Sequence, residues 1–331
     1  MPLYEFGYRE WDGTRRPRSL RFWAIARNGI YLSSRSKMLK RFMLVALFPI
    51  AYFALIFFGI GVVTDPSAGD AQGWAHFVAS AAGSFEAADL LQERPEEARQ
   101  LAWSLAFYVY FAMIQTWIVM IVVAIVGPPL VAQDIRTKAF LIYFSKPINR
   151  WDYILGKATV VMSYVFAVTL LPALLLAVLA VAMASDIKAL SQVLPLLPKI
   201  FAAALIVGVP CTCVVLLLSA LTNYERFGMF AWLFLWIGGL VMYTLLRHTP
   251  GTEDVEWLRF FSLRDTTMAA LNWVFDVEGL AKSLGVERTV SEIIPSHQRE
   301  SPGLASLTFL GILSATCLAI LARRVAAPAR I

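Results

Sequence analysis

Residues Gly127 to Lys157 read GPPLVAQDIRTKAFLIYFSKPINRWDYILGK, a charged segment between two long uncharged apolar runs. From Asp134 to Phe144, polar and charged side chains alternate with aliphatic and aromatic ones, and this pattern predicts a short amphipathic helix. Pro147 lacks a backbone N–H and disfavours helical backbone at the residue before it, so we expect the helix to stop there. The pattern favours a structured connection between two membrane helices, although a basic loop would carry the same charges.

The composition identifies the class of protein. The chain of 331 residues is 59% hydrophobic and 16% charged, and its mean hydropathy is +0.65. These values exclude an ordinary soluble or disordered protein and indicate an integral membrane protein. Six apolar stretches are each long enough to cross a hydrocarbon layer about 30 Å thick. They are Phe42 to Val63, Trp103 to Gln133, Ala158 to Ala184, Ile200 to Leu221, Phe227 to Leu246 and Leu304 to Ala322. The predicted fold is an all-α membrane domain of six transmembrane helices.

The distribution of Lys and Arg predicts the orientation. Basic residues are concentrated before the first stretch, between the second and third, and after the sixth, whereas the connection after the first stretch is acidic. Because basic residues accumulate on the cytoplasmic side, we expect both termini in the cytoplasm and a multi-pass protein of the plasma (inner) membrane. The net charge of +6 fits this asymmetry and an attraction to anionic lipids, and we expect no binding to nucleic acid.

The stretches divide the chain into a cytoplasmic N-terminal segment, residues 1–41, and a transmembrane domain, residues 42–331. The domain has external loops at about residues 64–102 and 247–303 and the cytoplasmic segment at about residues 134–157. In the N-terminal segment, Ser19 to Lys40 mixes apolar with basic residues and predicts an interfacial helix, broken or bent near Asn28 and Gly29. In the second external loop, apolar residues interrupted by Arg259, Arg264 and Asp265 predict helices lying in the outer interface.

The segment from Asp134 to Lys157 resembles the conserved cytoplasmic segment of ABC-2 type transporter permeases. The matching features are an acidic residue, a short helix, a small-residue and Pro turn, and a Gly-Lys pair: Asp134, Thr137 to Phe144, Ser145 to Pro147, and Gly156-Lys157. The family commonly has Glu where this chain has Asp134, so the first half matches less closely than the second. The resemblance implies an N-terminal elbow helix, a cytoplasmic coupling helix, and a short re-entrant hairpin between the fifth and sixth spans.

By this resemblance the chain is the transmembrane permease subunit of an ATP-driven exporter. It would pair with a second permease subunit, identical or different, and with a separate cytosolic ABC ATPase that holds ATP and Mg. Lys157 is followed by Ala158, so this chain has no phosphate-binding loop and is not expected to be an enzyme. The expected ATPase-coupling residues are Asp134, Arg136, Thr137, Lys138, Phe140, Tyr143, Phe144, Lys146, Pro147 and Arg150. The alternative is a membrane-anchored scaffold or assembly protein whose external loops bind a partner without transport.

The six stretches contain no Asp, Glu, Lys, Arg or His, which disfavours a proton- or ion-driven carrier. Cys211 and Cys213 lie on different faces of one expected helix, and Cys317 lies in another, so they predict packing residues rather than metal ligands. We therefore expect no catalytic, cofactor-binding or metal site in this chain. The polar residues best placed to line a passage are Tyr108, Gln115, Thr116, Tyr164 and Thr169.

Overall fold

The structure is a computed structural model that describes residues 20–64, 71–82, 95–139, 143, 148–184, 188–249, 255–285, 290, 294 and 303–326. These residues form helices and connecting turns, and no strand occurs among them. Six helical stretches are long and apolar enough to cross a membrane: Lys37–Val63, Ala98–Arg136, Arg150–Ala182, Ala189–Leu221, Glu225–Arg247 and Gly303–Val325. Each overlaps one of the predicted stretches, so the prediction of a helical, multi-pass membrane architecture is confirmed.

Most spans consist of two or three helical segments. In chain order they are α2 (Lys37–Val45) and α3 (Phe48–Val63); α6 (Pro95–Val109), the π-helix η2 (Tyr110–Gln115) and α7 (Thr116–Arg136); α9 (Arg150–Val168) and α10 (Leu170–Ala182); α11 (Lys188–Val193) and α12 (Leu196–Leu221); α13 (Glu225–Leu233), the π-helix η3 (Phe234–Gly238) and α14 (Gly239–Arg247); and α19 (Gly303–Ala326). The helices outside the spans are α1 (Arg21–Ser34), α4 (Ala71–Ala82), the 3₁₀ helix η4 (Glu256–Phe261), α15 (Leu263–Phe275) and α16 (Val277–Leu284).

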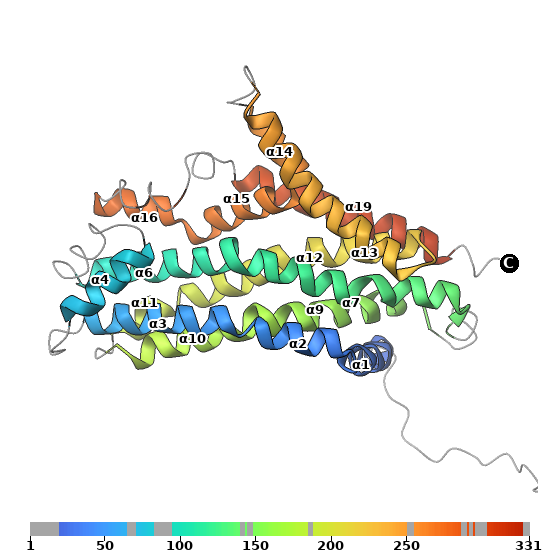
Figure 1. Cartoon of the computed structure of the whole chain (residues 1–331), viewed down its shortest axis with the longest axis horizontal. Helices are drawn as coiled ribbons and strands as arrows, with labels where there is room; N and C mark the ends of the chain where they lie inside the picture. Colours follow the sequence, from blue (N-terminus) through green and yellow to red (C-terminus); the bar gives the residue numbers. More distant parts are fainter. Residues whose placement is uncertain are drawn as a thin grey trace, which may run out of the picture.

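The spans run side by side along a bundle, with α4 and α16 at one end and α1 at the other (Figure 1). We name these the α16 end and the α1 end. α12 lies at the centre of the packing, in contact with α7, α9, α15 and α19. The half of the fifth span formed by α14 diverges from the bundle and carries exposed apolar side chains. An apolar surface of this kind is favourable against lipid and unfavourable in water.

Helix α1 crosses the spans, and it is seen nearly end-on in Figure 1 while the spans lie lengthwise. It packs against α9 through two glycines. A Cβ on Gly29 would lie 2.5 Å from Val160, and a Cβ on Gly156 would lie 2.7 Å from Ile25. α1 continues unbroken from Arg21 to Ser34, so the break expected near Gly29 is absent. The glycine instead allows α9 to approach closely.

Prolines inside the spans leave backbone carbonyls without their helical donors, and side chains from neighbouring helices supply replacements. Pro172 has no N–H to bond the carbonyl of Val168, and the hydroxyl of Tyr110 donates to that carbonyl at 3.3 Å. The carbonyl of Pro128 in α7 is a different case: the N–H of Ala132, four residues on, donates to the Ser219 hydroxyl at 3.0 Å, and this hydroxyl donates to that carbonyl at 2.6 Å. These bonds join the second span to the third and fourth.

The segment expected in the outer interface enters the bundle. α15 is buried along most of its length against α12 and α19, and it begins near the centre of the fifth span, where a Cβ on Gly239 would lie 2.5 Å from the carbonyl oxygen of Phe261. Its other end lies near the start of α12, where Lys199 donates to the carbonyl of Phe275 at 3.1 Å. The prediction of an interfacial location is therefore wrong for α15. Its charged residues are accommodated by contacts inside the protein instead of by water.

Candidate functional site

The second span ends at the start of the 134–157 segment. α7 runs to Arg136, so Asp134 and Arg136 belong to the span rather than to a separate helix. The Thr137 hydroxyl bonds the carbonyl of Gln133 at 2.9 Å, and Lys138 adopts a left-handed backbone with φ of 55°. A residue in this conformation terminates an α-helix, so the amphipathic helix expected from Thr137 onward does not begin at that residue.

The third span begins at the other end of the segment with a capping box. The backbone N–H of Asn149 donates to the Asp152 carboxylate at 3.1 Å, and the Asn149 side chain accepts a bond from the backbone of Asp152. These two bonds satisfy amide groups that have no partner within the helix. α9 therefore starts at Arg150, earlier than the apolar pattern indicated, and its first two turns present Tyr153 and Lys157 to the end of α7.

Asp134 and Lys157 form an ion pair between the second and third spans. The Lys157 Nζ lies 2.7 Å from the Asp134 Oδ2, and the side chains are only 8% and 13% exposed, respectively. The hydroxyl of Tyr153 donates to the same carboxylate oxygen at 2.7 Å. Such a buried pair holds its geometry because separating its members would leave a charge without compensation in a poorly solvated place.

Tyr143 connects the middle of the segment to this ion pair. Its ring packs edge-on against Tyr153 with the centroids 5.5 Å apart, and the Lys157 ammonium lies 5.8 Å from its centroid. Burial raises the pKa of the Tyr143 phenol, and the negative charge of Asp134 raises it further, so the phenol stays neutral at physiological pH. The ammonium of Lys157 is thus enclosed by one carboxylate and two tyrosine rings.

A cavity of about 340 Å³ adjoins the ion pair. It lies between α1, the start of α2 and the end of α7, and its polar lining includes Asn28, Ser33 and Gln133 as well as Asp134 and Lys157. The ion pair, α1 and the segment therefore meet around one cavity at the α1 end of the bundle.

The structure places the expected coupling residues in two groups. Asp134 and Tyr143 point into the ion-pair cluster, whereas Arg136, Thr137, Lys138 and Arg150 are exposed around it. Phe140, Phe144, Lys146 and Pro147 lie outside the described residues, so the helix expected there stays a prediction.

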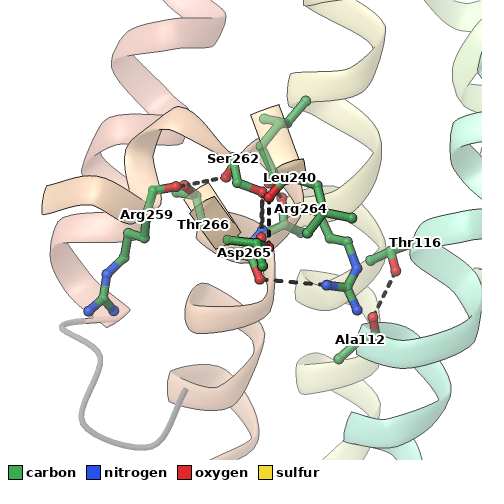
Figure 2. Close-up of polar contacts among 11 residues, drawn as sticks. Ala112, Thr116, Leu240, Arg259, Ser262, Arg264, Asp265 and Thr266 are labelled. Atoms are coloured by element: carbon green, nitrogen blue, oxygen red, sulfur yellow. Dashed lines mark hydrogen bonds and ion pairs between the residues drawn. The ribbon is translucent and has the colours of Figure 1, made fainter. Parts of the chain in front are cut away.

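A second polar cluster lies at the start of α15, deep in the bundle (Figure 2). Ser262 caps α15 and donates to the Asp265 carboxylate, and Thr266 donates to the carbonyl of Arg259 at 2.9 Å. The guanidinium of Arg264 extends toward the second span and lies 3.5 Å from the Asp265 carboxylate. The six predicted stretches contain no charged residue, but α15 brings Arg264 and Asp265 among the spans.

The five residues expected to line a passage lie in different surroundings. Tyr108, Gln115, Thr116 and Thr169 are fully buried, and Figure 2 shows Thr116 beside the Arg264 guanidinium. Thr116 and Thr169 bond carbonyls of their own helices. Tyr164 lies apart from the others and donates to the carbonyl of Ile30 in α1 at 2.9 Å. Thr116 is thus placed beside a charged side chain, and Tyr108 also has Arg264 and Asp265 in its electrostatic surroundings.

The site residues predicted from the sequence do not include Tyr153, Lys157 or Arg264. Tyr153 and Lys157 are separated by four residues, so they share one helix face once α9 is known to start at Arg150, and the capping residue Asn149 could have indicated that start. No comparable local pattern marks Arg264, because its position depends on the return of the chain into the bundle.

Comparison with known proteins does not assign the chain to a family. No protein-family model matches the sequence, and no curated protein matches it.

Proposed function

We propose that this chain is the transmembrane permease subunit of an ATP-driven exporter of the ABC-2 type. The observation that carries the proposal is the ion pair between Asp134 and Lys157, which ties the charged segment to the second and third spans. Tyr143 extends this cluster into the middle of the segment. A force applied to the segment by a partner would therefore reach two membrane helices directly.

In the proposed arrangement the α1 end faces the cytoplasm of an inner-membrane protein. A cytosolic ABC ATPase, which binds ATP and Mg, sits against the segment, and its closure moves α7 and α9 through the Asp134–Lys157 pair. α1 follows α9 because Gly29 and Gly156 bring the two helices into close contact. α1 would then act as an elbow helix on the membrane surface, and η4 with α15 would form the re-entrant hairpin that the family resemblance implies. A second permease subunit completes the passage.

The exposed basic residues suit the rim of an ATPase interface. Arg136, Lys138 and Arg150 surround the buried cluster and are themselves exposed. Interfaces of this kind commonly bury an aromatic anchor and leave charges at the edge. We assign Phe140 and Phe144 to the anchor and Tyr143 to the link between the anchor and the ion pair. The scaffold function is the outcome if none of them affects an ATPase.

The test is co-purification of the ATPase and measurement of its stimulated hydrolysis in nanodiscs, across single alanine variants. Truncating a buried anchor typically costs about 2 kcal/mol or more, whereas an exposed charge costs under about 1 kcal/mol. Phe140→Ala, Tyr143→Ala or Phe144→Ala should therefore release or uncouple the ATPase, and Lys138→Ala should mainly change the sensitivity to salt. If the aromatic variants insert normally and change neither quantity, the segment is an ordinary loop and the scaffold function is favoured.

A further inference from the structure

An apolar groove lies on the side of the bundle where the first and second spans meet. It has a volume of about 340 Å³ and is lined by α2, α3 and the second span, including Val45, Phe48, Met113 and Trp117. Trp117 is the central residue of the span Ala98–Arg136, so the groove reaches the middle of the second span. Phe48 is 79% exposed and Trp117 is 37% exposed, so the groove is accessible from outside the protein.

The ring of Trp117 also contacts a charged side chain. The guanidinium carbon of Arg264 lies 5.4 Å from the centroid of the ring, which is within the range of a cation–π contact. Trp117 is thus a wall of the apolar groove and the neighbour of a guanidinium near the middle of the second span. The apolar groove and the positive charge therefore both border Trp117.

The charge of Arg264 is incompletely compensated. Its Nε–H is buried and makes no hydrogen bond, and its contact with Asp265 is a long one of 3.5 Å. The Asp265 carboxylate is also held by Ser262, and Arg247 is a further positive group in its electrostatic surroundings. A guanidinium is costly at this depth unless a carboxylate or phosphate matches its donors. The site therefore favours an added negative group.

We propose that this face binds an anionic amphiphile, with its hydrocarbon tail in the groove beside Trp117 and its carboxylate or phosphate on Arg264. The inference rests on the proposed function in one respect, since it names the class of molecule that the exporter would move. Ordinary bilayer lipids keep their head groups about 15 Å from the membrane centre, half the hydrocarbon thickness. A head group at the depth of Arg264 therefore fits a molecule taken up by the protein better than a lipid of the surrounding bilayer.

The test is a binding measurement on the purified chain in nanodiscs of phosphatidylcholine, without an ATPase. The probe is stearic acid brominated at the middle of its chain, because bromine quenches tryptophan fluorescence only at short range. We expect saturable quenching that Trp117→Phe removes. The methyl ester of the same acid keeps the tail but lacks the charge, so it should bind at least about tenfold more weakly, as loss of a charge-assisted hydrogen bond would produce.

Two variants test the charged part and the apolar part of the site separately. Arg264→Gln should weaken binding of the acid about tenfold or more and leave binding of the ester unchanged. Val45→Trp, which fills the groove from the side of α2, should weaken binding of both molecules. Lys282→Gln is the matched control, since this lysine is an exposed charge on α16, paired with Glu278 away from Trp117.

The double variant Arg264→Gln/Asp265→Asn guards against misfolding, because it removes both members of the ion pair at once. It should retain a normal melting temperature and still lose the preference for the acid over the ester. Equal binding of acid and ester to the wild type, or unchanged binding of the acid to Arg264→Gln, would overturn the proposal.

A competition experiment distinguishes a transported amphiphile from a lipid of the bilayer. Competition by free fatty acid but not by anionic phospholipid supports a transported molecule, whereas equal competition by both identifies a bilayer lipid and overturns the transport assignment. Because no ATPase is present, a failure to bind leaves the proposed ATPase coupling intact. Conversely, loss of coupling in the aromatic variants of the 134–157 segment leaves this binding result intact.

Discussion

At the scale of single residues, the surroundings of a charged side chain in the fold decide what it contributes to stability. Lys157 is followed by an apolar run and could extend to the membrane surface, yet its ammonium is 2.7 Å from Asp134 and enclosed by two tyrosine rings. The pair joins two spans at the point where the chain between them leaves the membrane. Removing one member leaves the other charged and buried, whereas removing both leaves only a gap in packing.

We therefore predict a strong non-additivity between Asp134→Asn and Lys157→Met. Each single variant should destabilise the protein by about 3 kcal/mol, the usual cost of breaking a buried pair, and the double variant should cost clearly less than the sum. The measurement is thermal unfolding in detergent, with Tyr153→Phe as a control that removes one hydrogen bond and no charge. Additive losses would show that the two charges are independently solvated.

At the scale of helices, the sequence predicted the elements that hydrophobicity determines. All six spans follow from the length of the apolar runs, because lipid imposes the same requirement on each of them. The start of α9 was missed because its first turns contain charged residues, one of which, Lys157, is paired with Asp134 in α7. α15 was misplaced for the same reason: Asp265 is satisfied by Ser262 and Arg264, and no local pattern reveals that these contacts lie inside the bundle. The charged segment at residues 134–157 was identified, but not the ion pair at its ends.

The contact between α1 and α9 can be tested with one substitution. In Gly156→Val the new Cβ would lie 2.7 Å from Ile25 and 3.0 Å from the backbone oxygen of Phe22, so α1 must move. We expect a loss of about 1–3 kcal/mol, typical of overpacking, and faster thiol labelling of Ile25→Cys, which is buried in the native protein. Gly311→Val is the matched control, because a Cβ there meets nothing within 4 Å. Equal effects of the two substitutions would mean that α1 is not docked on α9.

At the scale of the whole molecule, the proposed orientation assigns opposite ends of the bundle to opposite compartments. Ser283 on α16 and Lys138 after α7 are both exposed, and they lie toward opposite ends. In a background without Cys211, Cys213 and Cys317, an impermeant thiol reagent added to intact cells should label Ser283→Cys and leave Lys138→Cys unlabelled. Lysed cells provide the control, since both cysteines should then react. Labelling of Lys138→Cys in intact cells would reverse the orientation and remove the basis for a cytosolic ATPase partner.

The energy source of transport is a property of the whole molecule, and the structure identifies a carboxylate on which it could depend. The sequence contains no ionisable group in the predicted stretches, but Asp265 and Arg264 lie beside the centre of the second span. A membrane carboxylate could in principle couple transport to protons. Asp265, however, already accepts a hydrogen bond from the Ser262 hydroxyl and lies 3.5 Å from Arg264, so a proton-transfer cycle at this carboxyl would have to break both contacts.

We therefore predict that ATP alone drives transport. In inverted membrane vesicles that contain the chain and its ATPase, accumulation of a fluorescent fatty acid should continue when a protonophore collapses the gradient and ATP is maintained. Asp265→Asn should leave the pH profile of accumulation unchanged, because no proton transfer at this carboxyl belongs to the cycle. Loss of accumulation with the protonophore, together with an altered pH profile in Asp265→Asn, would instead identify a gradient-coupled carrier that uses Asp265 as its proton site. Loss with the protonophore and an unchanged profile would place the coupling group elsewhere in the chain, and the ATP-driven function would still be excluded.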